Sequence, residues 1–159
     1  MTREQDLALL RRAIEIAEKA KADGNHPFGA LLADAAGKIL IEQGNVFTTL
    51  GSLGHAESEV ARRGAEKYSP EELAKMTLYT SVEPCAMCTG TLYWAGIGAL
   101  VFGMTEKRLL EMTGNHAENP TINLPSRTVL AAGQRAVEVR GPFGEVEDDI
   151  AKAHQGFWR

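Results

Sequence analysis

Apolar residues recur along this chain with two different periods, and the periods predict an alternation of helices and strands. Between residues 4 and 23, apolar side chains occupy positions 7, 10, 14 and 17, which form one face of an amphipathic helix, and Gly24 supplies its end. Short runs of strand-forming residues follow at 30–34 and 38–43 around an Ala-Ala-Gly turn, and they predict a hairpin. A loop rich in Gly, Thr and Ser is expected over 44–54.

The rest of the chain alternates helical patterns with buried-strand patterns. Helices are predicted over 55–67, 69–76, 84–95, 105–112, 126–132 and 145–154, and strands over 77–81, 99–103 and 136–140. Strands that alternate with helices favour helical layers on both faces of a mostly parallel sheet, the arrangement of an α/β protein. The 159 residues contain no visible linker or repeat, so the pattern predicts a single domain over 1–159.

Charge changes this picture by disfavouring one class of partner. The chain has 17 Lys and Arg against 21 Asp and Glu, a formal net charge of −4. Because nucleic-acid affinity rests mainly on Lys and Arg at phosphates, we expect no nucleic-acid partner.

No apolar run approaches the ~18 residues of a membrane span, and the charged segment 1–6 lacks the apolar core of a secretory signal. We therefore expect no membrane partner and a cytoplasmic location.

The only two cysteines, Cys85 and Cys88, directly follow Pro84. Their spacing places both thiols on one face of the predicted helix start, where the partial positive charge favours the thiolate form that binds zinc. Two cysteines exclude a disulfide framework. One alternative is a thioredoxin-like redox pair, which would follow an early strand instead of lying past the middle of the chain. Another is a pair of small buried residues without chemistry.

His55 stands at another predicted helix start, ahead of both cysteines. Helix starts that follow strands gather at the carboxyl ends of those strands, so His55 can converge with Cys85 and Cys88. Three protein ligands leave one coordination position open, which is typical of catalytic zinc. The sequence therefore predicts one Zn²⁺ per chain. Glu57 can fold back from the first helical turn toward water on the metal; a simple charge–dipole contact at the helix start is the alternative.

These motifs resemble the cytidine-deaminase-like zinc deaminases, whose signature is His-x-Glu followed by Pro-Cys-x-x-Cys. The resemblance extends from about residue 4 to the end and includes His26-Pro27-Phe28-Gly29-Ala30, Gly44-Asn45 and the segment 78–85. It is greatest for the branch of bacterial guanine deaminases, tRNA adenosine deaminases and fungal-type cytosine deaminases. The resemblance implies a three-layer α-β-α sandwich with a five-stranded mixed sheet, the cytidine deaminase-like fold, and a homodimer.

The resemblance also implies roles for individual residues. Glu57 would take a proton from the activated water and pass protons to the ring nitrogen and to the departing ammonia. Asn45 would hydrogen-bond the base or sugar, although a strand-end turn explains it too. Phe28 would stack on the ring unless it is a core residue, and Ala56 would offer its backbone N–H. The loop after residue 113 and the helix and tail over 145–159 would cover the site, which adds as candidates Asn115, His116, Glu118, Phe157 and Trp158.

The predicted substrate is a free nucleobase or nucleoside, with guanine or a related aminopurine or aminopyrimidine as the leading choice. Wobble-tRNA editors carry Asp-Pro-Thr before His-Ala-Glu and are basic, whereas this acidic chain has Gly-Ser-Leu-Gly at 51–54. Editing of tRNA adenosine and deamination of cytosine are the enzymatic alternatives. A zinc-stabilised binding module without catalysis is the non-enzymatic one, and the presence of Glu57 argues against it.

Overall fold

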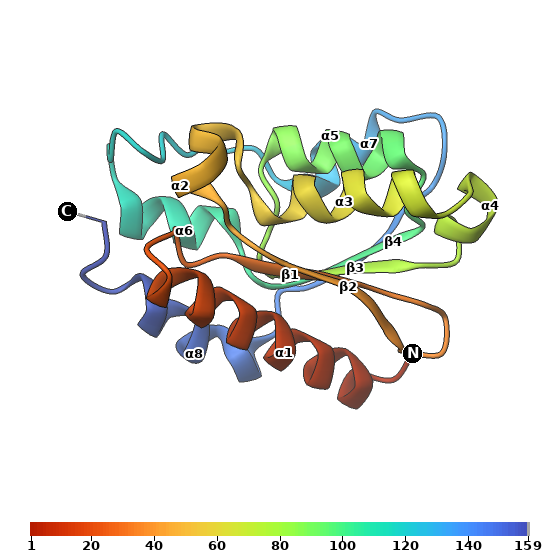
Figure 1. Cartoon of the computed structure of the whole chain (residues 1–159), viewed down its shortest axis with the longest axis horizontal. Coiled ribbons are helices and arrows are strands. Elements are labelled where there is room, and N and C mark those ends of the chain that lie inside the picture. The colour runs from red at the N-terminus through yellow and green to blue at the C-terminus, as the bar shows by residue number, and fades with distance from the viewer. Residues whose placement is uncertain (159) are drawn as a thin grey trace.

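A five-stranded mixed sheet separates two layers of helices in the computed structural model, which describes residues 1–158 (Figure 1). The strand order is β2-β1-β3-β4-β5. The strands are β1 (Gly29–Ala33), β2 (Ile39–Gly44), β3 (Thr77–Val82), β4 (Ala99–Met104) and β5 (Glu138–Arg140). β1 is antiparallel to β2 and β3, while β3, β4 and β5 are mutually parallel, so β1 alone opposes the direction of the other four. The predicted three-layer sandwich with a mixed sheet is confirmed.

Helices cover both faces of the sheet. In Figure 1, α1 (Arg3–Ala22) and α8 (Gly144–His154) lie on one side, and α3 (Ala56–Lys67), α5 (Ala86–Ala95) and α7 (Ser126–Ala131) lie on the other. The remaining helices are α2 (Phe47–Leu50), α4 (Pro70–Leu73) and α6 (Glu106–Thr113). The segment predicted as a loop over 44–54 differs from expectation, because it contains α2 and a 3₁₀ turn at Gly51–Leu53. None of the helices in the described part of the chain is long and apolar enough to cross a bilayer.

The central strands are buried on both faces, and this explains their continuous apolar runs. Successive residues of β1 alternate between two core clusters, with Leu31 packed on the side of α1 and α8 and Leu32 on the side of α3. At the first residue of β1, a Cβ on Gly29 would collide with the backbone of α1. Glycine therefore lets α1 pack directly against the sheet, and this close packing fixes where the segment before β1 lies.

The segments that contain the predicted site residues meet at one end of the sheet. Val82 at the end of β3 is aligned with Met104 at the end of β4, because these strands are parallel. The first residue of the antiparallel β1, Gly29, is paired with the last residue of β2, Gly44. The residues that precede β1 and those that follow β2, β3 and β4 consequently meet at this end, which is where ligands bind in open α/β sheets.

A buried ion pair ties α1 to the sheet and carries a stability prediction. Asp6, 2% exposed, accepts hydrogen bonds from Tyr79 Oη at 2.7 Å and from Arg140 Nε at 2.7 Å. Replacing Asp6 by Ala leaves the Arg140 guanidinium without its buried partner, so we expect unfolding free energy to fall by about 3 kcal/mol. Urea denaturation measures the unfolding free energy. Glu4→Ala, which changes an exposed acid of the same helix, is the control. If Asp6→Ala lowered the unfolding free energy no more than Glu4→Ala does, the pair of Asp6 and Arg140 would not stabilise the fold.

Candidate metal centre and active site

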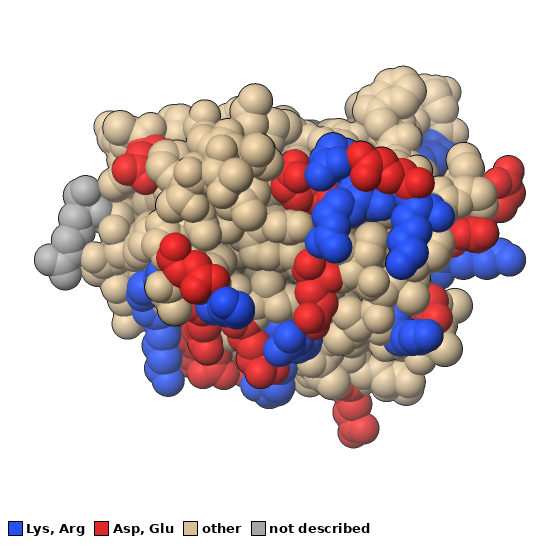
Figure 2. Space-filling model, in the orientation of Figure 1, with Lys and Arg blue, Asp and Glu red and all other residues tan. Residues whose placement is uncertain are grey.

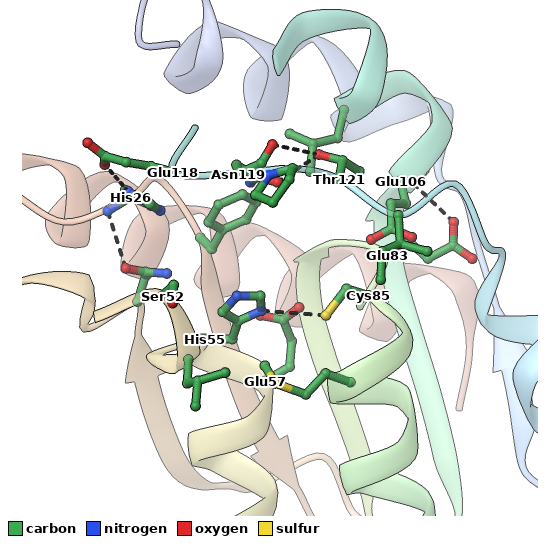
Figure 3. Close-up of a pocket in the computed structure, with 17 residues that line it drawn as sticks. His26, Ser52, His55, Glu57, Glu83, Cys85, Glu106, Glu118, Asn119 and Thr121 are labelled. Carbon is green, nitrogen blue, oxygen red and sulfur yellow. Dashed lines mark hydrogen bonds and ion pairs between the residues drawn. The ribbon is translucent and has the colours of Figure 1, made fainter. Parts of the chain in front are cut away.

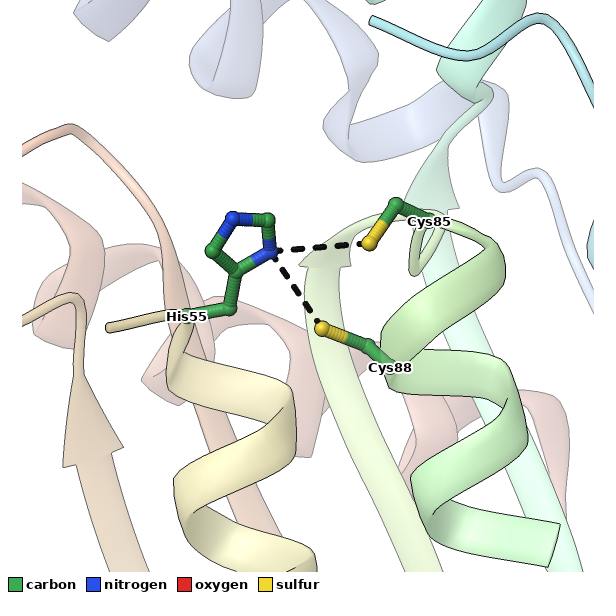
Figure 4. Close-up of side chains that lie close together, drawn as sticks. All are labelled: His55, Cys85 and Cys88. Carbon is green, nitrogen blue, oxygen red and sulfur yellow. Dashed lines mark hydrogen bonds between the residues drawn. The ribbon is translucent and has the colours of Figure 1, made fainter. Parts of the chain in front are cut away.

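His55, Cys85 and Cys88 converge at this end of the sheet. His55 directly precedes α3, Cys85 directly precedes α5, and Cys88 lies in the first turn of α5 (Figure 4). His55 Nδ1 is 3.5 Å from Cys85 Sγ and 3.4 Å from Cys88 Sγ, and all the potential ligand atoms lie within 4.8 Å of one another. Zinc bonds of about 2.0 Å to nitrogen and 2.3 Å to sulfur in a tetrahedron separate two ligand atoms by roughly 3.5 Å, so these spacings fit the ion.

The chemistry of the donor set fits zinc as well. A hydrogen bond from Cys88 and another from His55 lower the pKa of the Cys85 thiol to about 4, against the opposing effect of burial. The Cys88 sulfur is fully buried and accepts a hydrogen bond from Ser58 Oγ at 3.1 Å. Among the residues that the structure describes, no other His, Cys, Asp or Glu joins this cluster, which leaves one tetrahedral position open.

Glu57 lies next to the potential metal ligands, in the first turn of α3. Its side chain is 5% exposed and lines the same cavity as His55 and Cys85, and Figure 3 shows it directed into the space beside the His55 ring. Burial raises the pKa of Glu57 to about 7, partly offset by the charge of His55. A carboxyl group with a pKa near neutrality both accepts and returns a proton readily, as a general acid–base requires.

A cavity of about 290 Å³ lies above the triad and is lined by residues from several segments of the chain. Figure 3 shows His26 on one side of the cavity, Glu83 and Glu106 on the opposite side, and a roof that contains Glu118, Asn119 and Thr121. Asn45 is hydrogen-bonded to His26, and the lining also includes Phe28, Leu109, Pro120 and Ile122. Ser52 and Leu53 from the 3₁₀ turn and Met87 complete the lining. Most of the residues on the two sides of the cavity belong to the segments that precede β1 or follow β2, β3 and β4. The residues of the roof belong to the segment after α6.

Asn45 presents a defined polar group to this cavity. Its Oδ1 accepts hydrogen bonds from the backbone N–H of His26 at 3.3 Å and of Phe47 at 2.9 Å. Because the carbonyl half of the amide is engaged by the protein, the NH₂ half is the one available to a ligand. Asn45 thus lines the cavity with its Oδ1 occupied by backbone donors. Ala56, also predicted, is fully buried at the start of α3.

The C-terminal tail supports the aromatic wall from behind. Trp158 Nε1 donates a hydrogen bond to His154 Nδ1 at 3.0 Å. The Trp158 ring centroid lies 4.9 Å from that of His26 and 6.0 Å from that of Phe28, and both of those residues line the cavity. Trp158 itself is not among the lining residues, and Arg159, the last residue of the predicted tail, lies outside the described residues.

The loop after α6 contains the other predicted contacts. Glu118 lines the cavity and its Oε1 lies 2.8 Å from His26 Nε2. The His116 ring packs 5.3 Å from Trp158, and its Nδ1 accepts a hydrogen bond from the backbone N–H of Glu118 at 3.1 Å. Asn115 is exposed, and neither Asn115 nor His116 lines the cavity. As substrate contacts, all the predicted residues stay predictions: Phe28, Asn45, Ala56, Asn115, His116 and Trp158.

Two buried acids of the wall, Glu83 and Glu106, were missed by sequence reasoning. Glu83 Oε1 accepts from the backbone N–H of Glu106 at 3.0 Å, and Oε2 accepts from the N–H and Oγ of Ser126 at 2.9 and 2.7 Å. Glu83 thus connects the end of β3 to the starts of α6 and α7. The available signal was an acid just after each of two buried parallel strands, because such positions meet at one edge of a sheet.

Comparison with known proteins identifies relatives of this chain. Residues 3–104 match the family model for the cytidine and deoxycytidylate deaminase zinc-binding region. A probable cytosine deaminase of Schizosaccharomyces pombe is 37% identical over 98% of this chain and 93% of its own length. A tRNA-specific adenosine deaminase of Haemophilus influenzae is 38% identical over 65% of this chain and 60% of its own length. The solved structure of guanine deaminase from Bacillus subtilis matches with a TM-score of 0.60 and 32% identity, covering 70% of this chain and 69% of that one.

Proposed function

The chain belongs to the cytidine and deoxycytidylate deaminase family of zinc-binding enzymes, and on that premise we propose that it removes the amino group of a small free nucleobase by hydrolysis. The observation that carries the proposal is the cavity of about 290 Å³ that His55, Glu57 and Cys85 line. The reaction converts a ring carbon that bears an amino group into a carbonyl, consuming one water and releasing one ammonia. Cytosine and guanine are the leading substrates.

The chain's own side chains supply the proton transfers. When bound by His55, Cys85 and Cys88, zinc supplies Lewis-acid activation of a water molecule, whose pKa falls to about 7. Glu57 takes the two protons of the attacking water in turn and delivers one to the ring nitrogen and the other to the departing amine. Because Glu57 is buried and lines the cavity, its carboxyl group lies beside the space that the reacting groups would occupy. One zinc per chain suffices for this chemistry.

Substrate orientation follows from the walls of the cavity. The NH₂ group of Asn45 donates to an acceptor on the ring, and Phe28 supplies an apolar surface beside it. The N–H groups in the first turn of α3, that of Ala56 included, have no carbonyl partner within the helix. They offer a second donor for a ring oxygen. Each of these contacts is a proposal for this chain.

The size of the cavity and the relatives both favour a free base over a nucleic acid. Ligand pockets commonly measure about 300–1,000 Å³. This cavity of about 290 Å³ lies just below that range, and its size suits a single ring system. Two relatives are named for bases, a probable cytosine deaminase and a guanine deaminase, and the first of them matches over nearly the whole chain. On the face shown in Figure 2, Lys and Arg alternate with Asp and Glu, and Arg62, for example, pairs with Glu59 and Glu66.

Two further features complete the proposal. We propose that residues 1–159 act as one domain, with the segment 145–159 supporting the cavity from behind.

We also propose that the enzyme is a homodimer, since Trp94 on α5 is 85% exposed and lies among other apolar side chains between α3 and α5. Light scattering during size-exclusion chromatography tests the dimer.

An ammonia-release screen tests the proposed substrate class. Purified protein is offered cytosine, guanine, isocytosine and adenine, the corresponding nucleosides, and a tRNA with adenosine at the wobble position. We expect ammonia from at least one free oxo-bearing base, and little from its nucleoside. A Glu57→Gln preparation serves as the blank for contaminating deaminases. Turnover confined to the tRNA would contradict the proposal and support the editing alternative, which the relative from Haemophilus influenzae represents.

The contact between His26 and Glu118 carries a prediction about substrate binding. Burial lowers the pKa of His26, so the neutral ring donates its Nε2–H to Glu118 Oε1, 2.8 Å away, and holds the roof over the cavity. Glu118→Ala removes the acceptor, and we expect KM to rise roughly tenfold with kcat little changed. Glu118→Gln keeps an acceptor oxygen and should retain the original KM. Steady-state kinetics measures both, and equal KM values for Glu118→Ala and the native enzyme would refute the role of this contact.

A further inference from the structure

Glu83 lines the cavity directly after the end of β3, and its carboxyl group has no role in the chemistry described above. The residue precedes Pro84 and Cys85 in the chain, and its side chain is 6% exposed. Its backbone N–H donates to the carbonyl of Met104 at 2.7 Å, which extends the pairing of β3 with β4 by one residue. The backbone of Glu83 is therefore fixed by the sheet, close to one of the potential metal ligands.

Both oxygens of the Glu83 carboxyl group accept hydrogen bonds from the starts of two other helices. Oε1 accepts from the backbone N–H of Glu106 at 3.0 Å, and Oε2 accepts from the backbone N–H and the hydroxyl of Ser126 at 2.9 and 2.7 Å. Glu106 is the first residue of α6, and Ser126 is the first residue of α7. The N–H groups of a first helical turn have no carbonyl partner within their helix. Because α7 has no side-chain cap at its own N-terminus, Glu83 supplies the missing acceptor.

The two helix starts that Glu83 joins are the ends of one segment, residues 106–126, which contains α6 and the roof. Leu109 packs in the core and fixes α6 within this segment. The contact between Glu118 and His26 ties the roof to the opposite side of the cavity. At its last residue the segment comes back to Glu83, which holds it there with two of its three hydrogen bonds. One side chain therefore anchors both ends of the segment that carries the roof.

We propose that Glu83 is a positioning residue, which holds the segment 106–126 in place and thereby keeps the roof over the cavity. This deepens the proposed function and rests on it for the substrate. Because both carboxyl oxygens already accept hydrogen bonds from the protein, Glu83 acts through the segment that it holds. Figure 3 shows Glu83 beside Glu106, on the side of the cavity opposite His26. The roof is therefore secured from both sides, by Glu83 on one and by His26 on the other.

The position of the roof affects the binding of a base more than the chemical step. Glu57 and the potential metal ligands lie in or directly before α3 and α5, outside the segment 106–126. If the roof is in place for only part of the time, the apparent affinity for a base falls in proportion to that fraction. Loss of the Glu83 contacts should therefore raise KM and leave kcat and zinc binding little changed. A residue that merely stabilised the whole fold would not produce this division.

Hydrogen exchange and steady-state kinetics of the zinc-loaded protein test this role. In Glu83→Gln, one of the two backbone N–H groups loses its acceptor whichever way the amide turns. We expect amide exchange to become roughly tenfold faster within residues 106–126 and to stay unchanged in α5. KM for the best free base should rise roughly tenfold, with kcat and zinc content little changed. Ser126→Ala, which removes only the hydroxyl donor, should shift exchange and KM in the same direction by a smaller factor. Glu111→Gln, which changes an exposed acid of α6, is the control.

The outcomes separate this role from the proposed function and from a general effect on stability. If Glu83→Gln keeps the native KM, or if its exchange rises equally in α5 and in the segment 106–126, the inference is overturned while the proposed function stands. Should Glu83→Gln fail to fold, judged by circular dichroism, Ser126→Ala decides, and native exchange and KM in that variant overturn the inference. A native enzyme that releases ammonia from no free base contradicts the proposed function. The exchange comparison then still decides whether Glu83 anchors the segment, because it needs no substrate.

Discussion

Replacing Glu57 by Gln is expected to lower kcat about 1,000-fold while the protein keeps its zinc. The Glu57 side chain lies in the first turn of α3, buried beside His55, and burial raises its pKa to about 7. Glutamine has nearly the same shape but neither accepts nor delivers a proton at neutral pH. The metal ligands are left intact, so binding of zinc and folding should not change. Ammonia release under single-turnover conditions measures the chemical step directly.

A matched control distinguishes this role from a general effect of charge on α3. Glu66 is an exposed acid of the same helix that pairs with Arg62. Glu66→Gln should leave kcat and zinc content unchanged. If Glu57→Gln retained turnover within a few-fold of the native rate, Glu57 would not be the proton shuttle, and a different base would have to be found.

Replacing Cys88 by Ala is the second change with a large expected effect, and it acts on the metal. Cys88 is fully buried in α5 and supplies one of the three potential ligands. Two remaining ligands hold zinc far more weakly than three, so the variant should lose stoichiometric zinc on desalting and lose turnover to the background rate. Zinc bound to the folded state alone also stabilises that state. Chelation should therefore lower the melting temperature of the native protein and leave that of Cys88→Ala unchanged.

Thr91→Ala provides the control on the same helix. Thr91 donates its hydroxyl to the carbonyl of Met87 and is not a ligand. It should keep one zinc per chain and a normal response to chelation. A Cys88→Ala protein that kept both zinc and turnover would mean that the metal lies elsewhere.

The cluster of potential metal ligands and the layering of the fold were predictable because their signals are local. Pro84, the spacing of the two cysteines and the position of His55 at a helix start all report on single turns of helix. The alternation of strands with helices likewise predicts the layers. The direction of β1 was less accessible, because the antiparallel pairing of β1 with both β2 and β3 depends on neighbours distant in sequence.

The walls and the roof of the cavity depend on long-range contacts that no local pattern carries. Glu118 reaches the site through its contact with His26, far away in sequence. Trp158 is placed by His154 and packs behind Phe28, so its aromatic character alone did not reveal which side of the wall it occupies. Glu106 follows an ordinary helix cap at Thr105, and only the parallel register of β3 and β4 brings it beside Cys85.

The most direct test of the central claim is a zinc titration of the metal-free enzyme with ammonia release as the readout. Protein stripped by a chelator is loaded stepwise with zinc, and the rate on the best free base from the screen is measured at each step. We predict no turnover without metal and a rate that rises in proportion to added zinc up to one ion per chain. Turnover by the metal-free protein, or no gain on adding zinc, would contradict the assignment of a zinc-dependent deaminase.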